Sequence, residues 1–408
     1  MCGIVGYVGS REAVPVLLGG LEKLEYRGYD SAGVAVIGGG EGLFVRKTVG
    51  RLAALRKAID AEPAAGRTGI GHTRWATHGR PSDRNAHPHN DCNQRLSVVH
   101  NGIIENYLEL REELQRKGHI FVSETDTEVL PHLLEEYYDG DLLAAVRGAF
   151  PRLRGAFALA AVAAGEPGRI VAARLTSPLI VGLGRGENFV ASDIPALLEY
   201  TREVYILDDG ELADVTAGRV EVQRADGRRV DKSVFEVKWD AVAAEKGGFE
   251  DFMLKEIHEQ PRALRETLAG KIDRENLRVT LPELRLGRDD LARYKKIAVV
   301  ACGTAYHAGL VGKYILERLL RLPVEVDLAS EYRYRDPMAG PDVLTVVISQ
   351  SGETLDTLAG LRLAKEKGSR VLAITNVIGS SVAREADDLM LTMAGPEIAV
   401  ASTKAYTT

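Results

Sequence analysis

The second residue of the chain is a cysteine, and a glycine follows it. Because Met1 precedes a small residue, we expect its enzymatic removal, which leaves Cys2 with a free α-amine beside its own thiol. Reference pKa values of about 8 for the amine and about 8.5 for the thiol allow the amine to accept the thiol proton without a histidine. Gly3 leaves room for a substrate carbonyl. We expect Cys2 to be a nucleophile; the alternative is a frayed terminus without function.

A thiolate that attacks a carbonyl group needs hydrogen-bond donors for the oxyanion that develops. The segment VVHNGIIEN offers two of them, the side-chain amide of Asn101 and the unobstructed backbone N–H of Gly102. The alternative for this pair is an ordinary Asn-Gly turn after the strand.

Two charged residues could hold the ends of a free amino acid. Arg74, in GHTRWATHG, suits a bidentate grip on a carboxylate, and Asp126, in ETDTE, suits an α-ammonium group. The alternatives are a structural ion pair for Arg74 and a helix N-cap for Asp126. Taken with Cys2 and Asn101, these residues predict a pocket for an amino acid with a side-chain amide.

The second half of the chain contains two loops that could bind a phosphate group. ISQSGETLDT and ACGTAYHAG each place hydroxyl groups and a glycine between an apolar run and a helical pattern. Free backbone N–H groups at the start of a helix favour an anion there. The GxxxxGK[ST] motif does not occur, so a nucleoside triphosphate is not expected. The alternative is two ordinary turns with Ser or Thr caps.

The spacing of apolar residues predicts the elements that carry the first set of residues. We expect strands at Ile4–Val8, Ser31–Val36 and Leu96–His100, a helix from Val14 capped by Ser10, and a helix over 107–114 closed by Gly118. Asp209-Gly210 between two apolar runs predicts a hairpin over 204–215. Four short runs predict an antiparallel sheet: Phe157–Val162, Ile170–Ala173, Leu179–Leu183 and Phe189–Ala191.

The rest of the chain shows a different pattern of apolar residues. Residues 222–255 are polar and weakly periodic, which indicates a connection between domains. Near-continuous apolar strands then alternate with helical patterns such as Leu355–Lys367, which favours a doubly wound parallel sheet. The predicted strands are Ile297–Ala301, Val324–Leu328, Leu344–Ile348, Val371–Ile374 and Leu389–Met393.

Composition narrows the class of protein. The chain has 408 residues, 45% of them hydrophobic, and a formal net charge of −6, which suits a globular protein and argues against a general nucleic-acid or polyanion binder while leaving room for a local basic pocket. Three cysteines are too few for a disulfide framework, and with no signal peptide or apolar run of about 18 residues we expect a cytoplasmic protein with no membrane contact. We expect no metal site: His87, His89 and Cys92 are interpreted as a polar loop.

Five segments of the first half, MCGIVGYVG, EYRGYDSAGVA, GHTRWATHG, HNGIIEN and SETDTE, resemble the glutaminase domain of class II amidotransferases. This resemblance implies the αββα sandwich of N-terminal nucleophile hydrolases and the hydrolysis of glutamine to glutamate and ammonia. It also implies roles for individual residues: Cys2 as nucleophile, Asn101 and Gly102 as oxyanion hole, Trp75 near the ammonia exit, and a glutamine pocket of Arg74, Thr77, His78, Gly102 and Asp126.

The second half resembles a sugar isomerase (SIS) domain, a module that binds phosphosugars. A class II glutaminase followed by such a module resembles the family of glutamine–fructose-6-phosphate aminotransferases. The resemblance implies transfer of ammonia to fructose-6-phosphate, a homodimer, and no metal or redox cofactor. Ala305 stands where a serine is expected in many relatives. The residues implied to contact the sugar phosphate are Thr304, Ser349, Gln350, Ser351, Thr354 and Ser402.

The resemblance also implies a domain division: a glutaminase domain over 1–240, a linker over 241–255 and a first SIS domain over 256–408. Members of the family carry a second SIS module and a C-terminal tail with the isomerisation residues, and we expect this chain to be truncated before them. We therefore expect glutaminase activity alone from it. Two rivals stay open: a phosphosugar-binding regulatory protein with a silent glutaminase domain, and a different class II amidotransferase, such as a phosphoribosyl or asparagine enzyme.

Overall fold

The structure is a computed structural model, and by contacts it divides into two compact units, Met1–Ala241 and Val242–Thr408. Within the described part of the chain, no helix combines the length and the apolar character needed to cross a membrane. The structure describes residues 2–25, 28–38, 42–75, 79–237, 249–273, 276, 278–281 and 284–408.

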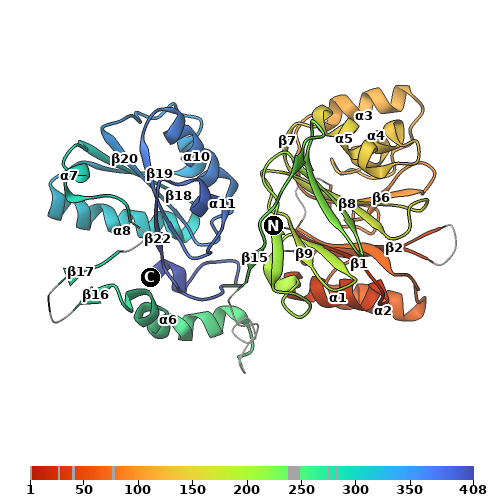
Figure 1. Ribbon diagram of the computed structural model, residues 1–408, viewed down its shortest axis with the longest axis horizontal. Helices are drawn as coiled ribbons and strands as arrows, with labels where there is room; N and C mark the ends of the chain where they lie inside the picture. Colours follow the sequence, from red (N-terminus) through yellow and green to blue (C-terminus); the bar gives the residue numbers. More distant parts are fainter. Residues whose placement is uncertain are drawn as a thin grey trace. The chain divides into compact units, whose positions relative to one another are not determined.

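Two antiparallel sheets lie face to face in the first unit (Figure 1). In order across the first sheet, the strands are β15 (Phe235–Glu236), β11 (Glu203–Ile206), β9 (Ile180–Leu183), β10 (Asn188–Ala191), β1 (Gly3–Val8), β4 (Thr68–Arg74), β2 (Ser31–Ile37) and β3 (Leu43–Val49). In the second sheet they are β14 (Arg229–Val230), β13 (Val220–Arg224), β12 (Glu211–Thr216), β8 (Arg169–Leu175), β7 (Gly155–Ala163), β6 (Leu96–Ile104) and β5 (His89–Asn90).

Helices cover the outer face of each sheet, so the first unit has the four layers of the predicted αββα sandwich (Figure 1). The first sheet packs on α1 (Ala13–Leu24) and α2 (Leu52–Ala61). The second packs on α3 (Tyr107–Arg116), α4 (Val129–Tyr137) and α5 (Leu142–Ala149). Two short 3₁₀ turns complete the unit, η2 (Phe150–Arg152) and η3 (Ile194–Ala196).

Strand β1 shows how the sequence builds these layers. Ile4 and Val8 point between the sheets, whereas Val5 and Tyr7 point toward the helices. Successive side chains of a strand point to opposite faces, and both faces of β1 are buried, so the run is apolar throughout. This burial ties down the start of the chain, and the alternative of a frayed terminus is wrong.

Four local predictions differ from the structure. Asp209-Gly210 does not close a hairpin, because β11 and β12 belong to different sheets and the turn carries the chain from one to the other. Asn101-Gly102 is not a turn either: β6 continues through it to Ile104, paired with β7. The cap residue of α1 is Glu12, not Ser10. Within the predicted connection, Arg229–Val230 and Phe235–Glu236 instead extend the two sheets.

The second unit contains the predicted parallel sheet (Figure 1). Its strands, in order across the sheet, are β19 (Val324–Leu328), β18 (Lys296–Ala301), β20 (Val343–Ser349), β21 (Arg370–Thr375) and β22 (Asp388–Leu391). The helices are α6 (Phe252–Leu268), α7 (Arg288–Leu291), α8 (Gly303–Leu320), α9 (Ala329–Tyr332), α10 (Leu355–Glu366), α11 (Ser381–Glu385) and α12 (Lys404–Thr407), and β16 (Ile272–Asp273) pairs with β17 (Arg278–Val279).

The strand order of this sheet creates a topological switch point. The first strand of the series, β18, lies between β19 and β20, so the chain leaves β18 toward one side and β20 toward the other. In open α/β sheets, ligands bind outside the carboxyl ends of the strands at such a point. The two loops that the sequence analysis singled out, after Ala301 and after Ser349, begin at these two strand ends.

Four buried histidines of the first unit have a lowered pKa: His72, His87, His89 and His100. Burial is the cause in each case, and it lowers the pKa of His72 to about 3, because a charged ring would lose its hydration. His87 stacks on His72 at a centroid separation of 4.1 Å. The folded unit therefore keeps these rings neutral at pH values at which the unfolded chain protonates them.

We predict that acid destabilises this unit well above the pH at which carboxylates titrate. A histidine that stays neutral when folded lowers the free energy of unfolding as the pH falls below about 6.5, by about 2 kcal/mol between pH 7 and pH 5. Denaturant unfolding of the His87→Phe variant should show a shallower pH dependence than the parent chain. His258→Gln, a change at an exposed residue of the second unit, should leave the dependence unaltered. Equal slopes for His87→Phe and parent would contradict the prediction.

Candidate active site

Cys2 precedes the first strand and lies beside the end of β4. Gly3 pairs with Thr73, and the backbone N–H of Trp75 donates a hydrogen bond to Cys2 Sγ at 3.2 Å. Burial raises the pKa of the Cys2 thiol, and the N–H of Trp75 opposes this shift. The strand pairing and the hydrogen bond together hold the sulfur in one place.

The side chain of Asn101 connects Cys2 to the second sheet. Its Nδ2 donates to the backbone oxygen of Cys2 at 3.0 Å, and its Oδ1 lies 2.9 Å from Nε2 of His72. Nε2 also lies 2.9 Å from the carbonyl oxygen of His100. Since both oxygens only accept, Nε2 carries the proton, and this fixes the Asn101 amide with its NH₂ group toward Cys2.

His72 was not singled out from the sequence, although it stands within the GHTRWATHG segment. It lies two residues after Ile70, which points between the sheets, so strand alternation places its ring there too. A histidine that follows Ile70 at strand spacing, and so falls on the face between the sheets, is the signal that could have identified it.

Gly102 lies in β6 with a φ of +116°, a conformation that L side chains rarely adopt. A Cβ atom at this position would overlap the carbonyl oxygen of Ala156 on the paired strand β7. Only glycine fits here, and it allows the strand to turn its peptide without losing its pairing with β7.

Arg74 is the last residue of β4 and is buried, with Nη2 donating to the carbonyl oxygen of Gly79 at 2.9 Å. Trp75 is 42% exposed and packs edge-to-face against Tyr29 at 5.2 Å. Thr77 and His78, which the resemblance assigned to the glutamine pocket, lie outside the described residues.

Asp126 is buried in the segment that leads into α4. Its Oδ2 accepts a hydrogen bond from the backbone N–H of Ile104 at 2.9 Å, so it holds the end of β6. The cap residue of α4 is Glu128, so the alternative of an N-cap at Asp126 is wrong. Strand β6 thus presents Asn101 and Gly102 near Cys2 at one point and contacts Asp126 two residues further on.

In the second unit, the loop after β20 is ordered by its own hydroxyl groups. Ser349 Oγ accepts from the N–H of Gly352 and lies 3.0 Å from Oγ1 of Thr354, the residue before α10. Ser351 Oγ accepts from the N–H of Glu353 at 3.2 Å. The loop therefore turns sharply at the carboxyl end of a central strand.

A cavity of about 270 Å³ adjoins this loop. Ser349, Gln350 and Ser402 line it together with Ala305, whereas Thr304, Ser351 and Thr354 do not. Thr304 lies in the first turn of α8, after the other loop at the switch point. The Oγ of Ser402 donates to Glu397 at 2.7 Å. The predicted residues thus gather around the switch point, and three of the six face one cavity.

Comparisons with known proteins agree with this architecture. Residues 72–199 match the family described as glutamine amidotransferase domain, and residues 290–408 match that described as SIS domain. The chain is 60% identical over 408 residues to the glutamine–fructose-6-phosphate aminotransferase (isomerizing) of Symbiobacterium thermophilum, and 57% identical over 407 residues to that of Thermus thermophilus. These alignments cover 100% of this chain and 67% and 66% of the two relatives.

A solved structure of glutamine phosphoribosylpyrophosphate amidotransferase from B. subtilis, complexed with ADP and GMP, is also similar. Its TM-score is 0.50 with 18% sequence identity, over 95% of this chain and 90% of that chain. At this identity the likeness supports the fold and nothing more.

The fold of the first unit and the two family matches therefore define a class II glutamine amidotransferase, to which a SIS domain is joined. The relatives are similar over the whole chain, and they specify the class further. The chain belongs to the family of isomerizing glutamine–fructose-6-phosphate aminotransferases, which confirms the resemblance and the enzyme class predicted from the sequence.

Two glycines of the second unit allow a matched test of the loop after β20. Gly352 and Gly303 have φ values of +66° and +59°, but a Cβ atom on Gly352 would overlap Ser380, whereas one on Gly303 meets nothing within 4 Å. Gly303→Ala should lower the free energy of unfolding by about 1–2 kcal/mol through backbone strain alone. Gly352→Ala should cost about 1–3 kcal/mol more because of the overlap. Equal losses in denaturant unfolding would contradict this account.

Proposed function

We propose that this chain is the glutamine-hydrolysing and sugar-phosphate-binding part of an isomerizing glutamine–fructose-6-phosphate aminotransferase. In this proposal the glutaminase domain spans 1–240, a linker spans 241–255, and the first SIS domain spans 256–408. The division of the chain after Ala241 supports these boundaries. Family membership also supports a homodimer, and the small number of cysteines supports a cytoplasmic location.

Cys2 is the nucleophile of the proposed reaction. With Met1 removed, the α-amine of Cys2 takes the thiol proton, and the sulfur attacks the side-chain amide carbon of glutamine. The carbon–nitrogen bond breaks, ammonia leaves with the proton from the amine, and a thioester remains. Water then hydrolyses the thioester to glutamate and restores the thiol.

Asn101 and Gly102 stabilise the oxyanion that forms in both steps. A single donor of this kind typically contributes about 3–4 kcal/mol to the transition state. The observation that carries the proposal is the Asn101 amide, which His72 holds by its Oδ1 so that its NH₂ group is directed at Cys2. A donor that is fixed before the substrate arrives needs no reorganisation during the reaction.

The other residues bind the substrates. Arg74 pairs with the α-carboxylate of glutamine and Asp126 with its α-ammonium group, with Thr77 and His78 completing the pocket and Trp75 near the ammonia exit. A pocket that excludes water keeps ammonia from being protonated before transfer. In the second unit the sugar phosphate is held by hydroxyl groups, the Gln350 amide and backbone N–H groups, from Thr304, Ser349, Gln350, Ser351, Thr354 and Ser402.

The nucleophile can be tested directly on the 408-residue chain. Cys2→Ala should lower the rate of glutamate release from glutamine by at least about 1,000-fold. A chain with an uncleaved extension before Cys2 keeps the thiol but loses the α-amine, and it should be equally inactive. Intact-mass measurement verifies each terminus. Turnover by Cys2→Ala at the parent rate would overturn the assignment, and an inactive parent chain that begins at Cys2 would favour the silent regulatory alternative.

The sugar-phosphate site can be tested by isothermal titration. We expect the chain to bind fructose-6-phosphate in preference to phosphoribosyl pyrophosphate. Thr354→Val removes one hydroxyl group and should weaken binding about 10-fold. Thr357→Val makes the same change one turn later in α10, at a buried hydroxyl whose partner is Cys302 at 3.9 Å, and should bind as the parent does. Preference for the pyrophosphate would favour a different class II amidotransferase.

A further inference from the structure

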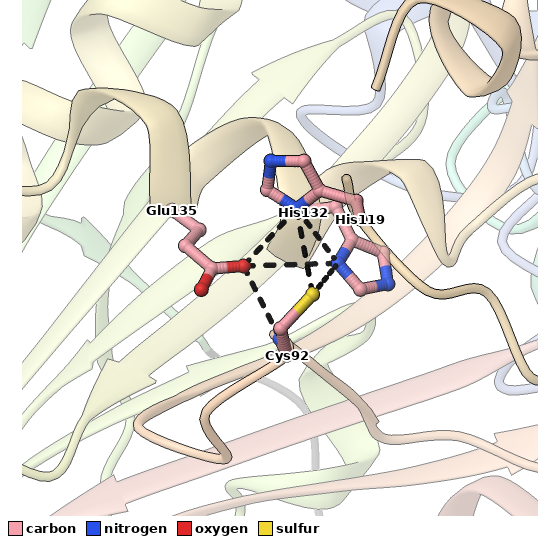
Figure 2. A group of neighbouring side chains, drawn as sticks. All are labelled: Cys92, His119, His132 and Glu135. Carbon is pink, nitrogen blue, oxygen red and sulfur yellow. Dashed lines mark hydrogen bonds and ion pairs between the residues drawn. The ribbon is translucent and has the colours of Figure 1, made fainter. Parts of the chain in front are cut away.

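Four side chains from three segments of the first unit point at one another: Cys92, His119, His132 and Glu135 (Figure 2). Their four nearest ligand atoms, the sulfur, two Nδ1 atoms and Oε2, all lie within 4.8 Å of one another. None of these residues has a role in the proposed glutaminase reaction. We call this group the Cys92 cluster.

Of five distances between ligand atoms of the cluster, four lie close to the edges of a tetrahedron around a zinc ion, and the fifth is longer. Bonds of about 2.3 Å to sulfur and about 2.05 Å to nitrogen give edges of about 3.6 Å for S···N and about 3.3 Å for N···N. Cys92 Sγ lies 3.4 Å from Nδ1 of His132 and 3.6 Å from Nδ1 of His119. The two Nδ1 atoms are 3.3 Å apart, and Oε2 of Glu135 lies 3.2 Å and 3.8 Å from them.

Each ligand is held by the local fold. Cys92 lies in the turn between β5 and β6, which Asp91 closes by accepting from the N–H groups of Arg95 and Leu96. His119 follows Gly118, the residue with positive φ that ends α3. His132 and Glu135 are three residues apart in α4, so they share one helix face. The side chains of His132 and His119 retain only 2% and 8% exposure.

The surroundings orient the lone pairs of the cluster toward its centre. Nε2 of His119 lies 3.0 Å from Oε1 of Glu136, an acceptor, so this nitrogen carries a proton, and in the neutral ring Nδ1 then presents a lone pair. Nε2 of His132 faces the carboxylate of Glu128 at 3.9 Å. Asn93 donates to Oε1 of Glu135 at 2.6 Å, and Oε2 accepts from the backbone N–H of Cys92 at 3.2 Å with its second lone pair left for the centre. Carboxylates behind histidines are typical of zinc sites, where they fix the tautomer.

We propose that the Cys92 cluster is a zinc-binding site with four protein ligands. A sulfur, two imidazole nitrogens and one carboxylate oxygen form a donor set that suits Zn²⁺, and without a cation the single thiol proton of Cys92 cannot satisfy all of these acceptors. On binding, the Cys92 thiol gives its proton to solvent and the sulfur becomes a thiolate ligand. Because the protein fills all four positions, the site is structural. His87 and His89 do not belong to the cluster. The ring of His87 stacks on that of His72, and Nε2 of His89 contacts Oγ1 of Thr125.

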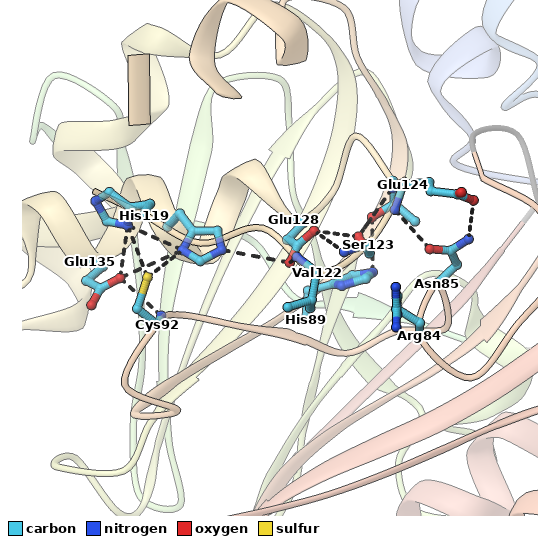
Figure 3. Close-up of polar contacts among 12 residues, drawn as sticks. Arg84, Asn85, His89, Cys92, His119, Val122, Ser123, Glu124, Glu128 and Glu135 are labelled. Carbon is cyan, nitrogen blue, oxygen red and sulfur yellow. Dashed lines mark hydrogen bonds and ion pairs between the residues drawn. The ribbon is translucent and has the colours of Figure 1, made fainter. Parts of the chain in front are cut away.

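The site would brace residues 122–128, a segment that includes Asp126. Figure 3 shows the contacts of Glu124 and Glu128 in this segment. Behind His132, Glu128 accepts hydrogen bonds from the N–H groups of Val122 and Ser123 at 2.7 Å each. The next residue, Glu124, is bound to Asn85 in both directions, at 2.9 and 3.0 Å. His119 precedes this segment, and His132 and Glu135 follow it in α4. A cation bound to all three therefore fixes both ends of the segment to the β5–β6 turn.

The first experiment uses the Cys2→Ala chain, because a free N-terminal cysteine can itself bind metal. After removal of metals, titration with Zn²⁺ should show one equivalent bound with a dissociation constant below about 100 nM. Co²⁺ should give the visible bands of a tetrahedral site and a thiolate charge-transfer band, and Zn²⁺ should abolish both. No binding, or octahedral Co²⁺ without a charge-transfer band, would overturn the proposal even if no further variant folds.

Variants in the same Cys2→Ala chain locate the site. Cys92→Ala should bind Zn²⁺ at least about 100-fold more weakly and lose the charge-transfer band, whereas Glu136→Ala should bind it about 10–100-fold more weakly and keep the band. Cys302→Ala removes the other remaining thiol and is the matched control, with binding unchanged. If Cys302→Ala loses the band and Cys92→Ala keeps it, the proposal is wrong.

Discussion

The hydrogen bond between His72 and Asn101 crosses from one sheet of the first unit to the other, and the proposed chemistry depends on it. The imidazole stays neutral because it is buried, and its single N–H is shared between two acceptors on β6. A protonated ring would still donate there, but it would place a charge in the layer between the sheets. Burial and tautomer together therefore determine which way the Asn101 amide faces.

In each unit the proposed site lies where strands that are not consecutive in the sequence end beside one another. In the first, β4 ends at Arg74 beside the start of β1, while β6 passes from the second sheet with Asn101 and Gly102. In the second, β18 and β20 end at a switch point of the parallel sheet. Rigid sheets determine the positions of the polar groups, and short loops supply their chemistry.

Most strands and many residues of the proposed sites could be predicted from the sequence. Runs of apolar residues indicate the strands, and short motifs contain Cys2, Asn101 and the loop after Ser349. The pairing of strands, and the contacts of residues, that are far apart in the sequence could not be predicted. Asp209-Gly210 has the local signature of a hairpin, yet burial of β12 against β8 places it in the second sheet. His119 and His132 stand 27 and 40 residues after Cys92, and only the fold brings the three together. The one local indication of the cluster in the sequence is the three-residue spacing of His132 and Glu135, which puts both side chains on one helix face.

The chain passes back and forth between the two sheets of the first unit, with β1 to β4 in one, β5 to β8 in the other, β9 to β11 in the first again and β12 to β14 in the second. Val5 pairs with Ala191 on β10, so the strand that follows Cys2 gains one neighbour only after most of the unit has been synthesised. Such interleaving gives a high contact order, which slows folding, and it makes the sheets form or melt as one cooperative body.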